Sequence, residues 1–277
     1  LSAANLKYFA AAFLSTGINE IFIPSKVKQI GERALMWCRS LKRVVFADDC
    51  EIVSFENELF RQSPVEEINL PNKLRELKRG WCKEMRKLKE IKISHENKHF
   101  LFINDEYLIN DINNNNCKEG EEGGGGGREL TRLYFARRDL RETKIINEIN
   151  VIESYSFQFC NQLERIEFES SHKSNLEIIE SSSFYSSSIK EIIIPSNTKT
   201  VKNSAFGECS CLKSIEFLGD FLEIGKVCLA GCTKLNFISF PNAKKVTIGS
   251  NSFSRISSNC RLFISPCSDI KYEEGFF

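Results

Sequence analysis

Residues Ile189 to Leu212 read IKEIIIPSNTKTVKNSAFGECSCL, and the order of apolar residues in this stretch recurs along the chain. The stretch opens with apolar residues at positions i, i+3 and i+5, and Pro195 follows directly. Because proline cannot donate a hydrogen bond to a neighbouring strand, it predicts the end of a strand. An Ala-Phe pair and Cys209 then precede the next opening triplet. The stretch therefore represents one unit of a repeat.

Eight copies of the opening triplet occur, at nearly constant spacing. Neighbouring copies start 23 to 26 residues apart within two groups of four, and 75 residues separate the groups. An interval of roughly 20–29 residues is typical of leucine-rich repeats. We therefore expect a solenoid, in which each unit contacts only its neighbours. The copies begin at Ile18, Leu41, Val65, Leu88, Leu163, Ile189, Leu212 and Leu235.

The pattern L-x-x-I-x-I-P-x-x-V-x-x-I-x-x-x-A-F-x-x-C resembles the treponemal-type, or BspA-like, leucine-rich repeat. Residues 18–31, INEIFIPSKVKQIG, are a near-ideal copy. The resemblance covers nearly the whole chain and implies an α/β solenoid, with the triplets forming a parallel β-sheet. We expect the A-F-x-x-C half of each unit to form a short outer helix or turn, which would be too short to be stable by itself.

The period is interrupted at residues 99–136. Apolar runs at 101–103, 107–109 and 130–135 predict short strands, which flank four asparagines and then five glycines. Such a polar, glycine-rich tract buries no apolar surface, so we expect a disordered hairpin tip. The predicted organisation is leucine-rich repeats at 1–98, the first partial, a β-hairpin insertion at 99–136, and further repeats with a tail at 137–277. The chain opens with what resembles the end of a repeat, so we expect a longer parent protein.

The charge balance excludes two classes of partner. A formal net charge of +1 provides no electrostatic reason to bind nucleic acid or an anionic membrane surface. The sequence also contains no uninterrupted apolar run of about 18 residues, the length that a membrane-spanning helix requires. We therefore expect no nucleic-acid partner and no membrane span in this segment.

Eleven cysteines would suggest disulfides in a small secreted protein. Four of them, however, lie three residues before the next triplet, and Met85 fills the same slot in another unit. A slot that accepts Cys or Met is typical of a core position for a soft hydrophobe. We expect free, buried thiols, although stacked slots about 4.8 Å apart would allow disulfides if the side chains align. The four are Cys38, Cys160, Cys209 and Cys232.

Two stretches resemble catalytic motifs. Residues 95–99, HENKH, match the H-E-x-x-H motif of zinc peptidases, in which both histidines share a helical face. Here the stretch follows a predicted strand at a repeat boundary, so we expect a turn. The glycine run at 123–127 lacks the G-K-[ST] ending of a phosphate loop. We predict no catalytic residue, metal site or cofactor, and keep a zinc peptidase as an alternative.

The outward positions of each triplet, i+2 and i+4, should face solvent. Several carry apolar side chains where polar ones would serve solubility, and exposed apolar residues among charges favour protein binding. We therefore predict a protein-binding sheet face. Its residues are Phe22, Arg43, Val45, Glu67, Glu90, Lys92, Arg165, Glu191, Ile193 and Phe237.

Two functions follow from these observations. BspA-like proteins are associated with cell surfaces and with adhesion to host or matrix proteins, so the resemblance implies a non-enzymatic adhesion or recognition protein, or surface antigen, that is displayed or secreted. Free thiols instead favour a reducing compartment. The alternative is therefore a cytoplasmic leucine-rich-repeat scaffold for protein assembly.

Overall fold

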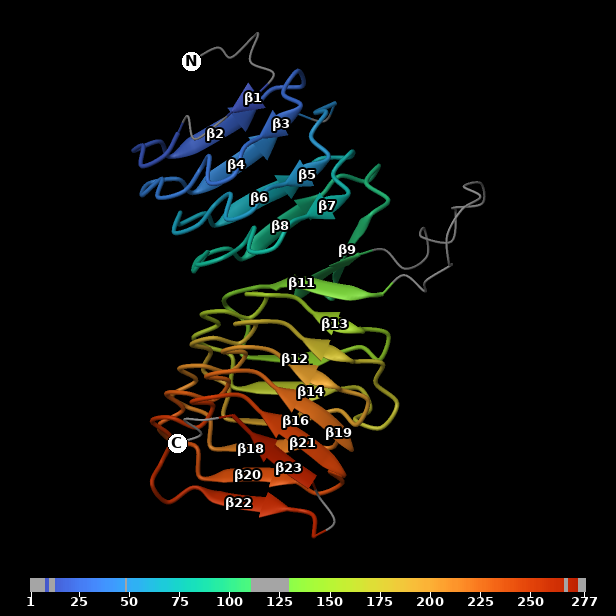
Figure 1. The fold of residues 1–277 in the computed structure, drawn as a ribbon. Helices are drawn as coiled ribbons and strands as arrows, with labels where there is room; N and C mark the ends of the chain where they lie inside the picture. The colour runs from blue at the N-terminus through green and yellow to red at the C-terminus, as the bar shows by residue number, and fades with distance from the viewer. Residues whose placement is uncertain (1–7, 10–12, 48, 111–129, 267–268, 274–277) are drawn as a thin grey trace. The chain divides into compact units, whose positions relative to one another are not determined.

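A computed structural model of the chain describes residues 8–9, 13–47, 49–110, 130–266 and 269–273 (Figure 1). The chain forms two compact units, Leu1–Arg137 and Arg138–Phe277. Each is a coil of short, mostly parallel strands, which confirms the predicted solenoid. Within the described ranges no segment is helical, so the α/β class and the outer helices are not found and turns take their place.

In the first unit, the triplets form a four-stranded parallel sheet, and shorter strands pair on a second side of the coil. The triplet strands are β2 (Glu20–Ile23), β4 (Arg43–Phe46), β6 (Glu67–Leu70) and β8 (Glu90–Ile93). The shorter strands are β1 (Tyr8–Phe9), β3 (Gln29–Ile30), β5 (Ser54–Phe55) and β7 (Glu76–Leu77), paired β1–β3 and β5–β7. An antiparallel set follows, of β9 (Phe100–Ile103), β10 (Tyr107–Asn110) and β11 (Arg132–Ala136).

In the second unit, six triplet strands form one parallel sheet and the shorter strands form another. The triplet strands are β12 (Glu142–Ile145), β14 (Arg165–Phe168), β16 (Glu191–Ile194), β18 (Ser214–Phe217), β20 (Phe237–Phe240) and β22 (Arg261–Ile264). The other strands are β13 (Val151–Ile152), β15 (Ile178–Ile179), β17 (Thr200–Val201), β19 (Phe221–Ile224), β21 (Lys245–Ile248) and β23 (Asp269–Tyr272).

The A-F-x-x-C half of each unit is a turn, because it contains two left-handed residues. Ser204 (φ 54°) and Glu208 (φ 58°) flank the Ala-Phe pair, and an α-helix of L-residues admits no such residue. Alternate amides donate across to the next repeat: Ser204 N–H to Lys226 O (3.0 Å), Phe206 to Cys228 (2.9 Å) and Glu208 to Ala230 (2.7 Å). The backbone is therefore satisfied between repeats and not within a helix.

Equivalent aromatic side chains stack along the core of the second unit. Ring centroids lie 4.9 Å apart for Phe157 and Phe184, and again for Phe184 and Phe206, where the rings are 1° from parallel. All three residues are fully buried. Burying each phenylalanine is worth roughly 1.5–3 kcal/mol. Because each ring contacts the rings of adjacent units, no single repeat provides this stabilisation alone.

The cysteine slot is buried as predicted, and its side chain also forms a hydrogen bond. Cys209 Sγ donates to Phe184 O at 3.0 Å, and Cys232 Sγ donates to Phe206 O at 3.1 Å. Ser63, the third residue after Phe60 as Cys209 is after Phe206, occupies the equivalent place, and its Oγ donates to Leu35 O at 2.6 Å. In these repeats the slot therefore holds a small donor for a carbonyl in the turn of the preceding repeat, whereas Met85 fills it without a donor in another.

Nine cysteines fall within the described residues. All nine are free thiols, and seven of them are buried. Burial raises the pKa of the Cys228 thiol to about 12 and also raises the pKa of Cys160, whose burial outweighs the opposing charge of Arg138. Thiols with such raised pKa values stay protonated and are inert toward oxidants near neutral pH.

Candidate functional site

The outward side chains of β2, β4, β6 and β8 form two columns across the first triplet sheet. Phe22, which is 61% exposed, lies directly opposite Val45 in the register. The neighbouring column is charged, and ion pairs link its residues: Arg43 lies 3.7 Å from Glu20 and 3.4 Å from Glu67. The six predicted residues of this unit therefore share one face. They are Phe22, Arg43, Val45, Glu67, Glu90 and Lys92.

Ion pairs hold the charged column in place. Lys92 Nζ lies 2.7 Å from Glu67 and 3.1 Å from Glu90. The hydrogen bond from Lys92 and the charge of Arg43 lower the pKa of the Glu67 carboxyl. Exposed pairs of this kind add little stability, typically about 0–1 kcal/mol each. Their effect is to order the side chains beside the Phe22–Val45 pair.

The second triplet sheet carries the other four predicted residues. Arg165, Glu191 and Phe237 are exposed and occupy one column across β14, β16 and β20. Ile193, which is 49% exposed, occupies the other column. The expectation that positions i+2 and i+4 of a triplet face solvent fails at one position of this sheet. Ser239 is an i+4 residue, yet it is only 3% exposed.

Proline shortens the pairing of the triplet strands. We call two neighbouring triplet strands a junction. Four residue pairs form at each junction in which the residue after the later strand has an N–H, namely β2–β4, β6–β8, β12–β14, β16–β18 and β20–β22. Where Pro71, Pro195 or Pro241 follows the later strand, the junction holds two, one and three pairs, respectively. The missing donor accounts for the last pair at each of these junctions, because elsewhere this N–H binds the last carbonyl of the earlier strand, as Ala47 N binds Ile23 O at 2.9 Å.

At the β4–β6 junction, the chain repairs this loss with a side chain. Asn69 Nδ2 donates to Phe46 O at 3.0 Å, and Phe46 N–H donates to Asn69 Oδ1 at 2.8 Å. The carboxamide thus supplies the donor that the adjacent Pro71 lacks, together with an acceptor for Phe46 N–H. Ile193 occupies the equivalent position at the β14–β16 junction and has no polar atoms in its side chain.

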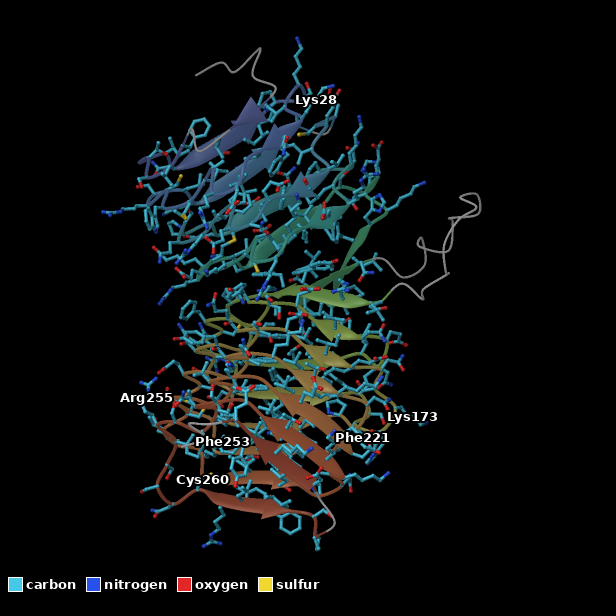
Figure 2. The ribbon with its side chains drawn as sticks, in the orientation of Figure 1. Lys28, Lys173, Phe221, Phe253, Arg255 and Cys260 are labelled. Carbon is cyan, nitrogen blue, oxygen red and sulfur yellow. The ribbon has the colours of Figure 1, made fainter. Side chains whose placement is uncertain are left out.

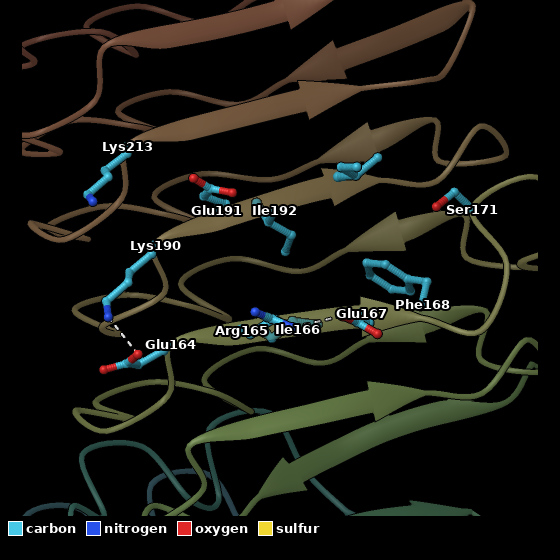
Figure 3. A pocket seen from close by; sticks show the side chains of 11 residues that line it. Glu164, Arg165, Ile166, Glu167, Phe168, Ser171, Lys190, Glu191, Ile192 and Lys213 are labelled. Atoms are coloured by element: carbon cyan, nitrogen blue, oxygen red, sulfur yellow. Dashed lines mark hydrogen bonds and ion pairs between the residues drawn. The ribbon is translucent and has the colours of Figure 1, made fainter.

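The β14–β16 junction opens into a depression on the outward face of the sheet (Figure 3). Its volume is about 630 Å³, and it reaches Ile166, Phe168 and Ile192, whose side chains are otherwise buried. Charged residues surround it, and Lys190 Nζ lies 2.5 Å from Glu164 at one end. Its lining is Glu164, Arg165, Ile166, Glu167, Phe168, Ser171, Lys190, Glu191, Ile192, Ile193 and Lys213.

Sequence reasoning selected three of these lining residues and missed the depression itself. Two signals were available for finding it. The triplets at Leu163 and Ile189 are 26 residues apart where most neighbours are 23 apart, and Pro195 follows the second of them. Neither signal indicates by itself that the pairing of β14 with β16 falls to one residue, Arg165 with Glu191.

Comparison with known families decides where the chain belongs. The profile of the BspA type leucine rich repeat region matches residues 9–113 and 128–260, with six copies. The chain belongs to the BspA-type leucine-rich repeat family. A comparison with curated proteins found no significant match.

Solved structures of bacterial repeat proteins share the BspA-type fold of this chain. A leucine rich cell surface protein from Faecalibacterium prausnitzii matches 95% of the chain at TM-score 0.74 and 20% identity. The pneumococcal vaccine antigen PcpA matches 94% at TM-score 0.64 and 20% identity, and a leucine-rich repeat protein from Eubacterium ventriosum matches 94% at 0.72 and 18%. The matched regions span 62%, 58% and 69% of those three chains.

The H-E-x-x-H stretch of this BspA-type chain forms a turn, so its histidines do not share a helical face. His95 is highly exposed in the turn after β8. The residue that organises the turn is Asn97, whose Nδ2 donates to Pro71 O (2.7 Å) and Leu74 O (2.9 Å). In the described part of the chain, no group of three or more His, Cys, Asp or Glu is placed to hold a metal ion.

The predicted strands around the insertion are present as β9, β10 and β11. The expected disordered tip, with its asparagine and glycine runs, lies outside the described residues. Over the ranges that are described, no helix has the length and apolar character of a membrane span.

A charged cluster lies on the turn side of the first unit. Glu58 lies 3.0 Å from Arg33, 3.2 Å from Arg61 and 2.6 Å from Lys83, in three adjacent repeats. Burial alone would raise the pKa of the Glu58 carboxyl, but the hydrogen bonds from Lys83 and Arg33 outweigh it and lower the pKa to about 2. The cluster thus links three adjacent repeats through ion pairs.

Proposed function

We propose that this chain is a non-enzymatic protein-binding module that recognises its partner through the outward face of its triplet sheets. The observation that carries the proposal is the exposure of apolar side chains among ordered charges. Phe22 is 61% exposed and Ile193 49% exposed, at positions where the fold itself needs no apolar residue. Apolar anchors surrounded by polar groups are typical of protein interfaces.

Membership of the BspA-type family supports a role in protein binding, and the similar structures support a site of action outside the cell. One of them is described as a cell surface protein and another as a vaccine antigen. The proposed partner is a host or matrix protein, and the proposed role is adhesion or recognition. The ten predicted residues of the two sheet faces would provide the contacts.

A cytoplasmic scaffold is the second candidate, because one observation favours it. The nine described cysteines are free thiols, which is common in reducing compartments. Seven of them are buried, however, and burial raises the pKa of Cys50, Cys160 and Cys228, so these thiols also resist oxidation outside the cell. The thiols are therefore compatible with the proposed extracellular role.

The test uses the full chain and two matched substitutions in the second unit. Phe237→Glu places a charge on the triplet sheet, and Phe221→Glu places one on β19 of the other sheet, where Phe221 is 54% exposed (Figure 2). Binding to immobilised fibronectin, fibrinogen and laminin is measured by surface plasmon resonance. We expect Phe237→Glu to weaken binding at least tenfold and Phe221→Glu to change it less than twofold.

Two results would contradict the proposal. Binding that Phe221→Glu weakens as much as Phe237→Glu would remove the triplet sheet as the interface. Absence of binding to all three proteins, combined with binding to cytoplasmic extract, would favour the scaffold. Thermal unfolding of both variants checks that neither substitution has unfolded the chain.

A further inference from the structure

We propose that the β14–β16 junction binds a carboxamide group, the side chain of an asparagine or glutamine in a protein partner. This inference rests on the proposed protein-binding function and names the chemistry of the group that the second triplet sheet would recognise. It follows from a comparison of this junction with β4–β6, where the chain places a carboxamide of its own.

The two junctions share the same defect. In each, a proline follows the later strand, so the last carbonyl of the earlier strand receives no backbone donor: Phe46 at β4–β6, and Phe168 at β14–β16. Asn69 restores both hydrogen bonds at the first junction, accepting from Phe46 N–H at 2.8 Å and donating to Phe46 O at 3.0 Å. A primary carboxamide suits this pair of groups because it carries both a donor and an acceptor.

At β14–β16 the defect is larger and nothing in the described chain repairs it. Only Arg165 and Glu191 are paired, so Phe168 has no paired residue in β16, and Pro195 cannot donate to its carbonyl. Ile193 stands where Asn69 stands, and its side chain neither donates nor accepts. Polar backbone groups without partners are costly next to apolar side chains, so a group that satisfies both is favoured.

The depression admits such a group from solvent. It lies on the outward face and reaches Phe168 and Ile192 between the strands (Figure 3). The apolar side chains suit the methylene groups of an asparagine or glutamine, whereas the polar atoms of its carboxamide meet the backbone. Among the described residues, Glu191 and Lys213 form no ion pair, so both charges on the rim are available to the residues that flank the carboxamide.

The experiment uses small probes, because the partner is unknown. Acetamide, acetone, acetate and N-methylacetamide are titrated separately into the full ¹⁵N-labelled chain, and amide chemical shifts are followed. We expect acetamide to shift the amides of Phe168 and Ile193 with a saturating curve. Acetone and acetate, which only accept hydrogen bonds, should produce no saturating shift at these positions.

Two substitutions at the same position provide the matched comparison. Ile193→Asn gives this junction the side chain that β4–β6 already has, so it should weaken acetamide binding at least tenfold and slow hydrogen exchange of the Phe168 amide. Ile193→Leu keeps the side chain apolar and should bind acetamide as the unchanged chain does. In case Ile193→Asn does not fold, Asn69→Ala provides an independent test, because it should create a new acetamide response at Phe46.

Four results would overturn the inference. They are acetamide shifts no larger than those with acetone, unchanged acetamide binding in Ile193→Asn, no new response in Asn69→Ala, and N-methylacetamide binding as well as acetamide, which would assign the site to a peptide backbone. The probes need no protein partner, so this site can fail while the sheet face still binds protein. Conversely, loss of the Phe237→Glu effect would leave the acetamide result intact.

Discussion

Replacing Cys209 by serine and by alanine separates the polar role of the cysteine slot from its apolar role. Alanine leaves the Phe184 carbonyl, 3.0 Å from Sγ, without its donor inside the core. An unsatisfied buried group costs about 1–3 kcal/mol, and loss of the buried sulfur adds roughly 0.8 kcal/mol if it counts as one methylene. We therefore expect Cys209→Ala to lower the free energy of unfolding by about 2–4 kcal/mol.

Serine should cost far less, because the chain already uses it in this slot. Ser63 Oγ donates to Leu35 O at 2.6 Å, so a hydroxyl fits the equivalent geometry. We expect Cys209→Ser to lie within about 1 kcal/mol of the unchanged chain, since the donor is retained. The prediction is thus an order of stability, with serine above alanine by about 1–3 kcal/mol.

The assay is equilibrium urea unfolding of the full chain in the presence of reductant, followed by circular dichroism. Cys211, which is only partly buried, provides the control: its serine and alanine variants should have equal stability. If Cys209→Ala proves as stable as Cys209→Ser, the slot is only a soft apolar position and the hydrogen-bond reasoning is refuted.

Three further predictions concern packing, pairing and pH. Ile192→Ala should lower the free energy of unfolding by about 2–5 kcal/mol through cavity formation, because Ile192 is 3% exposed. Glu191 is exposed, so Glu191→Ala should change it by no more than about 0.5 kcal/mol. Equal effects in thermal unfolding would contradict the assignment of inward and outward positions. Pro195→Ser should supply the missing donor and protect the amides of β16 from hydrogen exchange, and unchanged exchange would remove proline as the cause of the short pairing. Glu58→Gln should destabilise the chain by about 1–2 kcal/mol at pH 7. Folding lowers the pKa of Glu58 from 4.5 to about 2, so its contribution to stability is complete above pH 4.5 and disappears as the pH falls toward 2. The variant and the unchanged chain should therefore become equally stable near pH 2. A difference in stability that persists at pH 2 would refute the charge argument.

The repeat explains why the triplet strands were predictable. Ile192 and Ile194 are buried and Glu191 is exposed, as the parity of the strand requires. Ser239 breaks the rule, since it has outward parity but is buried, and nothing in the strand's own sequence distinguishes it. The sequence left a short helix and a turn as alternatives for the A-F-x-x-C half. The structure has a turn, because Ser204 and Glu208, on either side of the Ala-Phe pair, are left-handed.

The candidate site was only partly predictable. Parity placed Arg165, Glu191 and Ile193 on the outward face, where exposure agrees with it. The depression beside them arises because β14 and β16 pair at a single residue, and pairing between strands 26 residues apart depends on both of them. In the same way, Asn69 was recognisable as an outward polar residue, but its two hydrogen bonds to Phe46 join residues 23 positions apart.

The sequence by itself determined the period, the burial of most triplet positions and the points where proline removes a donor. These features are local, because each depends on the side chain at one position and on the alternation of its strand. The tertiary structure alone decided that the outer half of each unit is a turn and not a helix, that thiols donate to carbonyls, and that one junction is filled by Asn69 while another stays open. These features depend on hydrogen bonds between neighbouring repeats, and the geometry of such bonds exists only once the repeats are stacked.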